Sequence, residues 1–299
     1  MRFGAWLGLN DPWQDVLSEV RHVEAAGWDG VWVADHFMPS LERLFEPVQE
    51  AWTALAAMAA STTRVRLGTL VTGNTYRNPG VLAKQAAQVD IISGGRLILG
   101  MGSGWQENEH VAYDIPFFTV GARLRRLEES VQIIRSLFDN ETTTFQGRYY
   151  NIHEAPLSPK PAQAHLPILI GGGGEQMTLR IVAKHADEWN VWGSPDTVRR
   201  KGEILDRYME EAGRDPASIK RSAQLVLLIG EDGAENERRQ AQARVPTRAG
   251  TLEEIRDLMG GYRDIGLDEF ILAPQFEGSP QEKSEVRDRF IEDVAPAFR

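Results

Sequence analysis

Two glycine runs in this chain each follow a short apolar segment of the kind that forms a buried β-strand. Residues 167–176 read PILIGGGGEQ, and residues 97–105 read LILGMGSGW. Glycine lets the backbone adopt positive φ angles and approach a ligand closely, and the free N–H groups at the start of a following helix attract an anion. The sequence therefore predicts a phosphate-binding rim, formed by Gly171, Gly172, Gly173, Gly174 and Glu175 together with Gly102, Ser103, Gly104 and Trp105.

The alternative is that these glycines only make tight strand-to-helix turns. Four consecutive glycines lose more backbone entropy than such a turn requires, which favours ligand binding. A dinucleotide-binding fingerprint does not fit the spacing, because Trp105 and Gln176 stand where a third glycine would belong.

Polar side chains at other predicted strand ends are suited to proton transfer. The imidazole of His36 is of the type that moves a proton to or from a substrate heteroatom, and its neighbour Asp35 either orients it or belongs to the structural frame. Glu107 and Glu109 follow Trp105. If apolar neighbours raise the pKa of one of these carboxyl groups, it can serve as a proton-donating acid. The alternative is that both lie at the solvated start of a helix, where acidic side chains interact favourably with the helix dipole. No cluster of histidines and acids has metal-ligand spacing, so no metal site is expected.

Tryptophans accompany these segments. Trp6, Trp105, Trp189 and Trp192 either form the walls of a site for a planar cofactor or fill the protein core.

Strand and helix patterns alternate along the whole chain. The strand candidates are 2–8, 30–34, 65–71, 96–100, 168–170, 188–191, 221–229 and 269–273. Helical patterns occupy 13–26, 51–61, 80–92, 121–138, 176–185, 196–212, 251–265 and 282–294. Eight such units favour a closed (β/α)8 TIM barrel, in which active sites gather at the carboxyl ends of the strands. We expect one domain over residues 1–299.

The longest irregular region is the proline-containing segment 140–166, between the fourth of these helices and the fifth strand. It is either a lid over the site or a loop that shields the bottom of the barrel.

Composition narrows the function classes. The net charge of −10 argues against nucleic-acid binding, and the absence of cysteine excludes disulfides and thiolate metal sites. No apolar stretch is long enough for export or membrane insertion, so we expect a cytoplasmic protein that acts on a small molecule.

The ordered segments VWVADHF (31–37), RVRLGTLVTGNTYRNPGVLAKQAAQVDIISGGRLILGMGSGW (64–105) and PILIGGGGEQMTLRIVAKHADEWN (167–190) resemble the bacterial-luciferase-like superfamily. Within it, the chain is most similar to the F420-dependent oxidoreductases of the luciferase-like class.

This resemblance implies a TIM barrel that binds a deazaflavin or flavin, usually as a homodimer. It implies a non-prolyl cis peptide at Leu70–Val71, beside Thr72, that supports the cofactor ring. It also implies that the backbone from Gly172 to Gly174 holds the phosphate and that His36 contacts the reactive part of the ring.

The expected reaction is hydride transfer between F420 and a small organic substrate, with His36 moving the accompanying proton. The alternatives are an FMN-dependent monooxygenase on the same barrel and a non-catalytic flavin-binding protein. The sugar-phosphate dehydrogenases of this family have a glutamate acid where this chain has Trp105. The basic residues 199–201 lie near the place where relatives bind a substrate phosphate, and a solvated helix face is the alternative for them.

Overall fold

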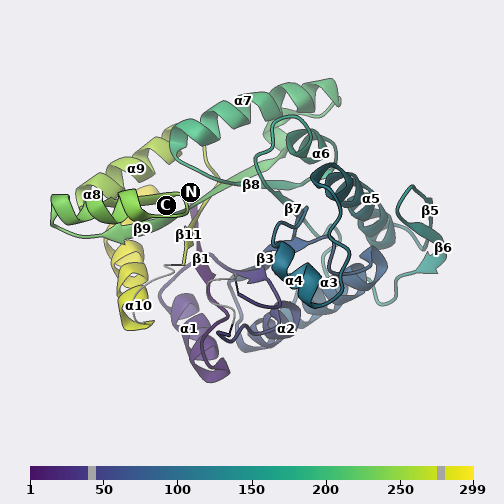
Figure 1. The fold of residues 1–299 in the computed structure, drawn as a ribbon, viewed down its shortest axis with the longest axis horizontal. Coiled ribbons are helices and arrows are strands. Elements are labelled where there is room, and N and C mark those ends of the chain that lie inside the picture. The colour runs from purple at the N-terminus through teal and green to yellow at the C-terminus, as the bar shows by residue number, and fades with distance from the viewer. Residues whose placement is uncertain (40–44, 275–279) are drawn as a thin grey trace.

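Eight parallel strands close into a barrel that helices surround (Figure 1). The computed structural model describes residues 1–39, 45–274 and 280–299. The barrel strands are β1 (Arg2–Leu7), β2 (Gly30–Asp35), β3 (Arg66–Gly73), β4 (Leu97–Gly102), β7 (Ile168–Gly171), β8 (Glu188–Trp192), β9 (Lys220–Ile229) and β11 (Glu269–Ala273). β9 pairs with both β8 and β11, which closes the ring. The predicted (β/α)8 barrel is confirmed, and no predicted strand end differs from the observed one by more than two residues.

The predicted helices are also present. They are α1 (Trp13–Ala25), α2 (Ala51–Ser61), α3 (Pro79–Ser93), α5 (Val120–Asp139), α6 (Thr178–His185), α7 (Pro195–Glu211), α9 (Leu252–Asp264) and α10 (Pro280–Arg289). Local capping explains several bounds: the Thr251 and Glu254 side chains form a capping box at the start of α9, and Gly94 ends α3 in the left-handed conformation. The helix predicted over 282–294 is divided, because a π-helical turn (Phe290–Val294) follows α10.

Shorter elements escaped the sequence prediction. They are α4 (Glu107–Ala112), α8 (Gly233–Gln242), β10 (Thr247–Gly250) and a hairpin of β5 (Thr142–Gln146) with β6 (Asn151–Pro156). α8 buries only Asn236, so it has no apolar periodicity to detect. β10 pairs with β9 outside the closed barrel.

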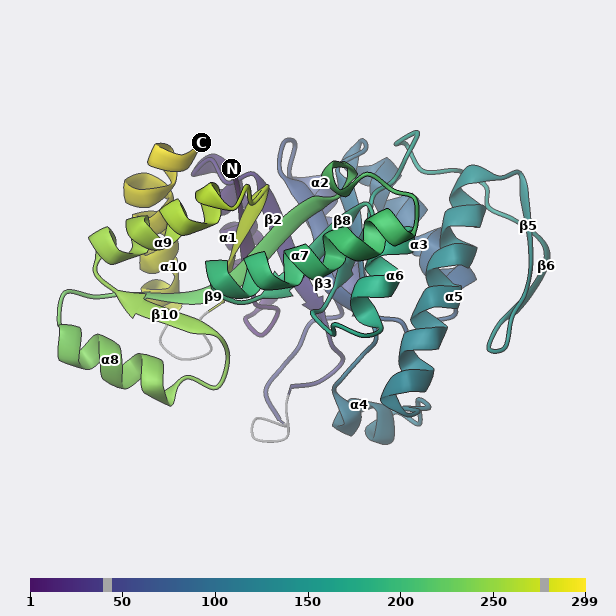
Figure 2. The same cartoon turned by 90° about the horizontal axis from the view of Figure 1, so that it is seen from above.

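The segment 140–166 contains this hairpin, which lies beside α5 at one end of the molecule (Figure 2). Farther along the segment, the Gln163 side chain donates to Asp90 at 2.7 Å and to the Leu97 carbonyl at 2.9 Å. Asp90 is near the end of α3 and Leu97 begins β4. These contacts lie at the amino-terminal ends of the strands.

The middle of the barrel is filled by side chains. Its inner cluster consists of Trp32, Leu70, Ile98, Leu169 and Ile271. A Cβ added to Gly68 would lie 2.5 Å from the Trp32 ring, so glycine makes room for this indole. Below the cluster, Arg66 pairs with Glu188 at 2.5 Å and with Glu269 at 2.8 Å. The filled barrel interior leaves the carboxyl ends of the strands as the end of the barrel where a ligand can bind.

Across the described ranges, no helix combines the length and the apolar character needed to span a membrane.

Candidate active site

The carboxyl ends of β3, β4 and β7 meet around Val71. The Leu70–Val71 peptide bond is cis, as the family resemblance predicts. A Cβ added to Gly102 would lie 2.5 Å from Val71 Cγ2, and one added to Gly171 would lie 2.8 Å from Val71 Cγ1. These two glycines are thus required for the close approach of Val71 to β4 and β7. Leu70 itself is buried inside the barrel.

The glycine run after β7 forms an open turn. Gly172 has a φ of +130°, and its N–H donates to the Asn190 carbonyl at 2.9 Å. Within the described parts of the chain, the N–H groups of Gly173, Gly174 and Glu175 have no backbone acceptor. The prediction that a helix opens at Gln176 was wrong: α6 begins at Thr178, so the free amides belong to the turn. Such a row of unpaired donors suits an anion.

Trp189 supports this turn from behind. Its side chain is fully buried, and its Nε1 donates to the Gly172 carbonyl at 2.9 Å. Trp189 also belongs to the hydrophobic core cluster, in agreement with the alternative that this tryptophan fills the protein core.

Two cations on α7 contact the same turn. The Glu175 carboxylate accepts hydrogen bonds from Arg200 at 2.7 Å and from Lys201 at 3.1 Å. Both hydrogen bonds lower the pKa of Glu175, and the one from Lys201 has the larger effect. Lys201 also donates to the Gly173 carbonyl at 2.6 Å. Arg199 instead pairs with Asp196 at 2.9 Å.

His36 and Glu109 come together although they are far apart in the sequence. His36 follows β2, Glu109 lies on α4, and His36 Nδ1 is 2.8 Å from Glu109 Oε1. The Tyr76 hydroxyl donates to the same carboxylate oxygen, and the Phe37 N–H donates to the other at 2.8 Å. Glu109 is fully buried, whereas about a quarter of the His36 side chain is exposed.

These contacts correct the expected role of Glu109. Burial on its own raises the pKa of Glu109, but hydrogen bonds from His36, Tyr76 and the Phe37 amide outweigh burial and lower it. Glu109 is therefore a carboxylate, and His36 Nδ1 must carry the proton that it donates. In the described residues, His36 Nε2 has no hydrogen-bond partner.

Asp35 does not contact the His36 ring. It is fully buried and accepts two hydrogen bonds from Arg77, at 2.5 Å and 3.2 Å. Arg77 also pairs with Glu50 at 2.7 Å. Thr72 is buried and accepts from Trp52 Nε1 at 3.0 Å. Asp35 and Thr72 thus connect the ends of β2 and β3 to the outer helices.

Aromatic rings line the same end of the barrel. Trp105 is 67% exposed and meets the His36 ring edge to face, with 5.6 Å between ring centroids. Trp6 is partly buried and contacts Trp192 at a centroid distance of 5.6 Å. Ser103 and the positive-φ Gly104 form the turn between β4 and Trp105.

Sequence reasoning missed Tyr76 and Phe37, the other two donors to Glu109. A signal for both existed, because each follows a predicted strand end within a few residues. The aromatic character of Tyr76 does not distinguish a hydrogen-bonded hydroxyl from a core residue.

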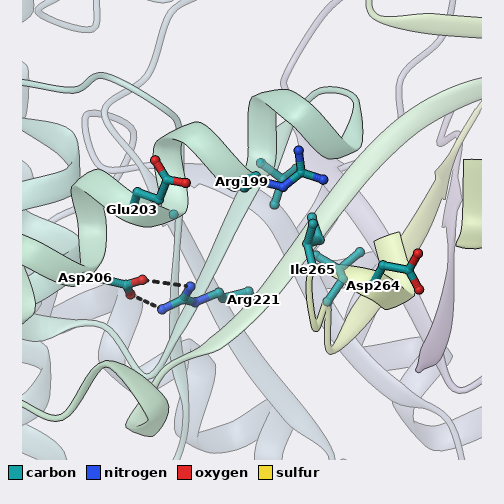
Figure 3. A pocket seen from close by; sticks show the side chains of 9 residues that line it. Arg199, Glu203, Asp206, Arg221, Asp264 and Ile265 are labelled. Atoms are coloured by element: carbon teal, nitrogen blue, oxygen red, sulfur yellow. Dashed lines mark hydrogen bonds and ion pairs between the residues drawn. The ribbon is translucent and has the colours of Figure 1, made fainter. Parts of the chain in front are cut away.

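A separate cavity of about 230 Å³ lies outside the barrel, between α7, β9 and α9 (Figure 3). It is lined by charged residues such as Arg199, Glu203 and Asp264, and an ion pair joins Asp206 to Arg221. None of its lining residues belongs to the strand-end site. Nor do the described residues contain a group of three metal-ligating side chains.

Comparison with known proteins agrees with the family resemblance seen in the sequence. Residues 1–264 match the family model described as luciferase-like monooxygenase. The chain is 33% identical over 224 residues to an F420-dependent glucose-6-phosphate dehydrogenase of Kineococcus radiotolerans, a match covering 71% of this chain and 63% of that protein. A protein of the same name from Amycolatopsis mediterranei is 37% identical over 175 residues, covering 58% and 50%. The chain thus spans less than two thirds of the length of these relatives.

Solved structures show the same fold. An F420-dependent secondary alcohol dehydrogenase in complex with an F420-acetone adduct superposes with a TM-score of 0.84 at 21% identity, over 100% of this chain and 99% of that one.

Proposed function

Because this chain belongs to the luciferase-like monooxygenase family, we propose that it is an F420-dependent oxidoreductase that transfers a hydride between F420 and a small organic substrate. The observation that carries the proposal is the His36–Glu109 pair, at 2.8 Å, at the same barrel end as two glycine turns. The F420-dependent names of its relatives support the choice of cofactor.

The residues present fit this cofactor. The unpaired amides of Gly173, Gly174 and Glu175 suit its phosphate, and the cis-bonded Val71 offers an apolar support for a planar ring. Ser103, Gly104 and Trp105 would complete the rim, with Trp6 farther along it. Bound F420 supplies the hydride chemistry, and the protein supplies position and proton transfer.

His36 is the proposed proton-transfer group. Since Nδ1 donates to the Glu109 carboxylate, Nε2 is the nitrogen with a free lone pair. During oxidation of an alcohol, Nε2 accepts the hydroxyl proton, and Glu109 stabilises the imidazolium that forms. Glu109 acts as a positioning residue that selects the tautomer, and Tyr76 and the Phe37 amide hold its carboxylate in place.

Two further features belong to this proposal. We propose a homodimer, supported by apolar side chains exposed near the two ends of α3, Val81 and Ile92, which are 55% and 40% exposed. Of the two roles considered for segment 140–166, its contacts with Asp90 and Leu97 favour shielding of the barrel bottom over a lid.

Parallel fluorescence titrations with F420 and FMN test the assignment. We expect saturable binding of F420 and, with His36→Ala, a large loss of turnover with little change in F420 affinity. Preference for FMN together with oxygen consumption would assign the monooxygenase alternative. Cofactor binding without turnover of any substrate would favour the non-catalytic one.

A further inference from the structure

We infer that the substrate of this site is a neutral, largely apolar alcohol or carbonyl compound and that the site disfavours a sugar phosphate. The inference rests on the proposed F420-dependent function and deepens it. It follows from three features around His36: the aromatic surface beside it, the pairing of the nearby cations and the excess of carboxylates.

The surface beside His36 is aromatic. Trp105, 67% exposed, packs edge-on against the imidazole, and Tyr113, 57% exposed, packs edge-on against Phe37 at a centroid distance of 5.9 Å. Large apolar side chains that water reaches next to a proton-transfer group favour a substrate that covers them with apolar atoms.

Two described arginines near this surface, Arg77 and Arg123, are already bound to protein groups. Arg77 is held by Asp35 and Glu50. Arg123 donates to the carbonyl oxygens of Gly104 and Phe118, at 3.2 Å and 2.7 Å, and its guanidinium lies 4.0 Å from the centre of the Phe117 ring. Asp35 and Glu50 already compensate the charge of Arg77, so a phosphate dianion would gain less from an ion pair with it.

The basic residues 199–201 are also paired, and the one positive charge that Glu175 leaves uncompensated lies beside the glycine turn proposed for the cofactor phosphate. Arg199 pairs with Asp196, and Arg200 and Lys201 pair with Glu175 beside the glycine turn. Lys283 lines a separate cavity of about 10 Å³ together with Trp6, apolar residues and Arg287, which pairs with Glu19 at 2.6 Å. This volume is about the smallest that holds one water molecule and is too small for a phosphate.

The charge next to His36 is negative. Glu109 is an ionised carboxylate in contact with its ring, and Asp35 and Glu50 together face the single positive charge of Arg77. Repulsion from the buried Glu109 carboxylate is poorly screened by solvent and disfavours a dianion.

In the part of the site that the structure describes, His36 Nε2 is the polar atom beside Glu109 that has no hydrogen-bond partner. Glu109 is saturated by His36, Tyr76 and the Phe37 amide, so His36 Nε2 is left for the substrate oxygen. In the oxidation, the substrate carbon gives its hydride to F420 and the hydroxyl gives its proton to Nε2. The alcohol becomes a carbonyl compound, and F420 takes up the two electrons. One such contact suits a substrate with a single polar atom at the reacting carbon.

The test compares glucose 6-phosphate, glucose and a series of secondary alkanols of increasing length. Calorimetry with the F420-bound protein measures binding, and the absorbance of F420 measures turnover. We expect kcat/KM for the alkanols to rise about fourfold per methylene group, and glucose 6-phosphate to bind more weakly than the longer alkanols.

Trp105→Ala should reduce the gain per methylene, Trp105→Phe should keep most of it, and Ile92→Ala, on the outer face of α3, should not change it. Lys283→Ala should leave the preference unchanged. Tighter binding of glucose 6-phosphate than of any alkanol, with F420 still bound, overturns the inference and leaves the proposed function intact. A protein that does not bind F420 overturns both.

Discussion

The Glu109→Gln variant isolates the positioning role of Glu109. The substitution keeps the side-chain volume in a fully buried position but removes the negative charge. His36 and Tyr76 share one oxygen of Glu109, and the Phe37 amide donates to the other, so a glutamine whose carbonyl oxygen accepts from Phe37 presents its NH2 group to His36 and Tyr76. If that NH2 donates to His36 Nδ1, the ring proton moves to Nε2, and Nε2 can no longer accept a proton from the substrate.

The size of the effect follows from the contact that is lost. A hydrogen bond to a charged group contributes about 1.5–3 kcal/mol. At about 1.4 kcal/mol per factor of ten, kcat/KM should fall by about tenfold to a hundredfold. Glu109 is screened from the cofactor by its partners, so F420 affinity should change less than twofold.

Steady-state kinetics across pH, together with fluorescence titration of F420, provide the assay. Glu107→Gln is the matched control, since it makes the same change at an exposed position of the same helix. Full activity of Glu109→Gln would refute the assigned tautomer. An equal loss of activity in the Glu107→Gln control would show that the effect comes from helix charge rather than from the His36 contact.

The remaining predictions concern stability and packing. The pKa of Glu109 is lower in the folded protein than its ordinary value of 4.5. The ionised Glu109 side chain therefore contributes fully to stability above pH 4.5, and this contribution is lost as the pH falls through the folded-state pKa. In urea unfolding, the difference in stability between wild type and Glu109→Gln should be smaller at about pH 3 than at pH 7. Gly102→Ala places a Cβ 2.5 Å from Val71 and should destabilise the protein by about 1–3 kcal/mol and weaken F420 binding. Gly260→Ala, where a Cβ meets nothing within 4 Å, should instead stabilise α9 by up to about 1 kcal/mol, and a loss of stability there would contradict the packing argument. Asp35→Ala leaves the buried side of Arg77 without its partner and should cost about 3 kcal/mol in thermal or urea unfolding; an unchanged midpoint would show that Glu50 alone suffices.

The barrel was predictable because its strands are apolar on both faces and its helices have one apolar face. Segments such as Leu97–Gly102 and Glu269–Ala273 are entirely buried, and continuous apolar runs of this length indicate parallel strands. The polar helix α8 and the strand β10 lack this pattern, since neither is packed into the barrel core, and so sequence reasoning missed them.

The sequence predicted which residues belong to the site better than it predicted the contacts between them. The rule that chemistry gathers at strand ends identified His36 and the two glycine turns. It did not show that Asp35 binds Arg77 rather than its neighbour His36, because the contact between Asp35 and Arg77 joins residues that are distant in the sequence and is set by the fold. The pKa of Glu109 was judged from its apolar sequence neighbours, whereas the groups that set it, His36 and Tyr76, come from other strand ends.

The central claim is that the carboxyl end of this barrel binds F420 with His36 at its reactive ring. A crystal structure of the protein with F420 tests it most directly. The account predicts that the phosphate accepts hydrogen bonds from the amides between Gly173 and Glu175, that the ring rests against Val71 and that His36 Nε2 faces the reacting carbon. A ligand bound elsewhere, or a phosphate that leaves those amides unpaired, would contradict it.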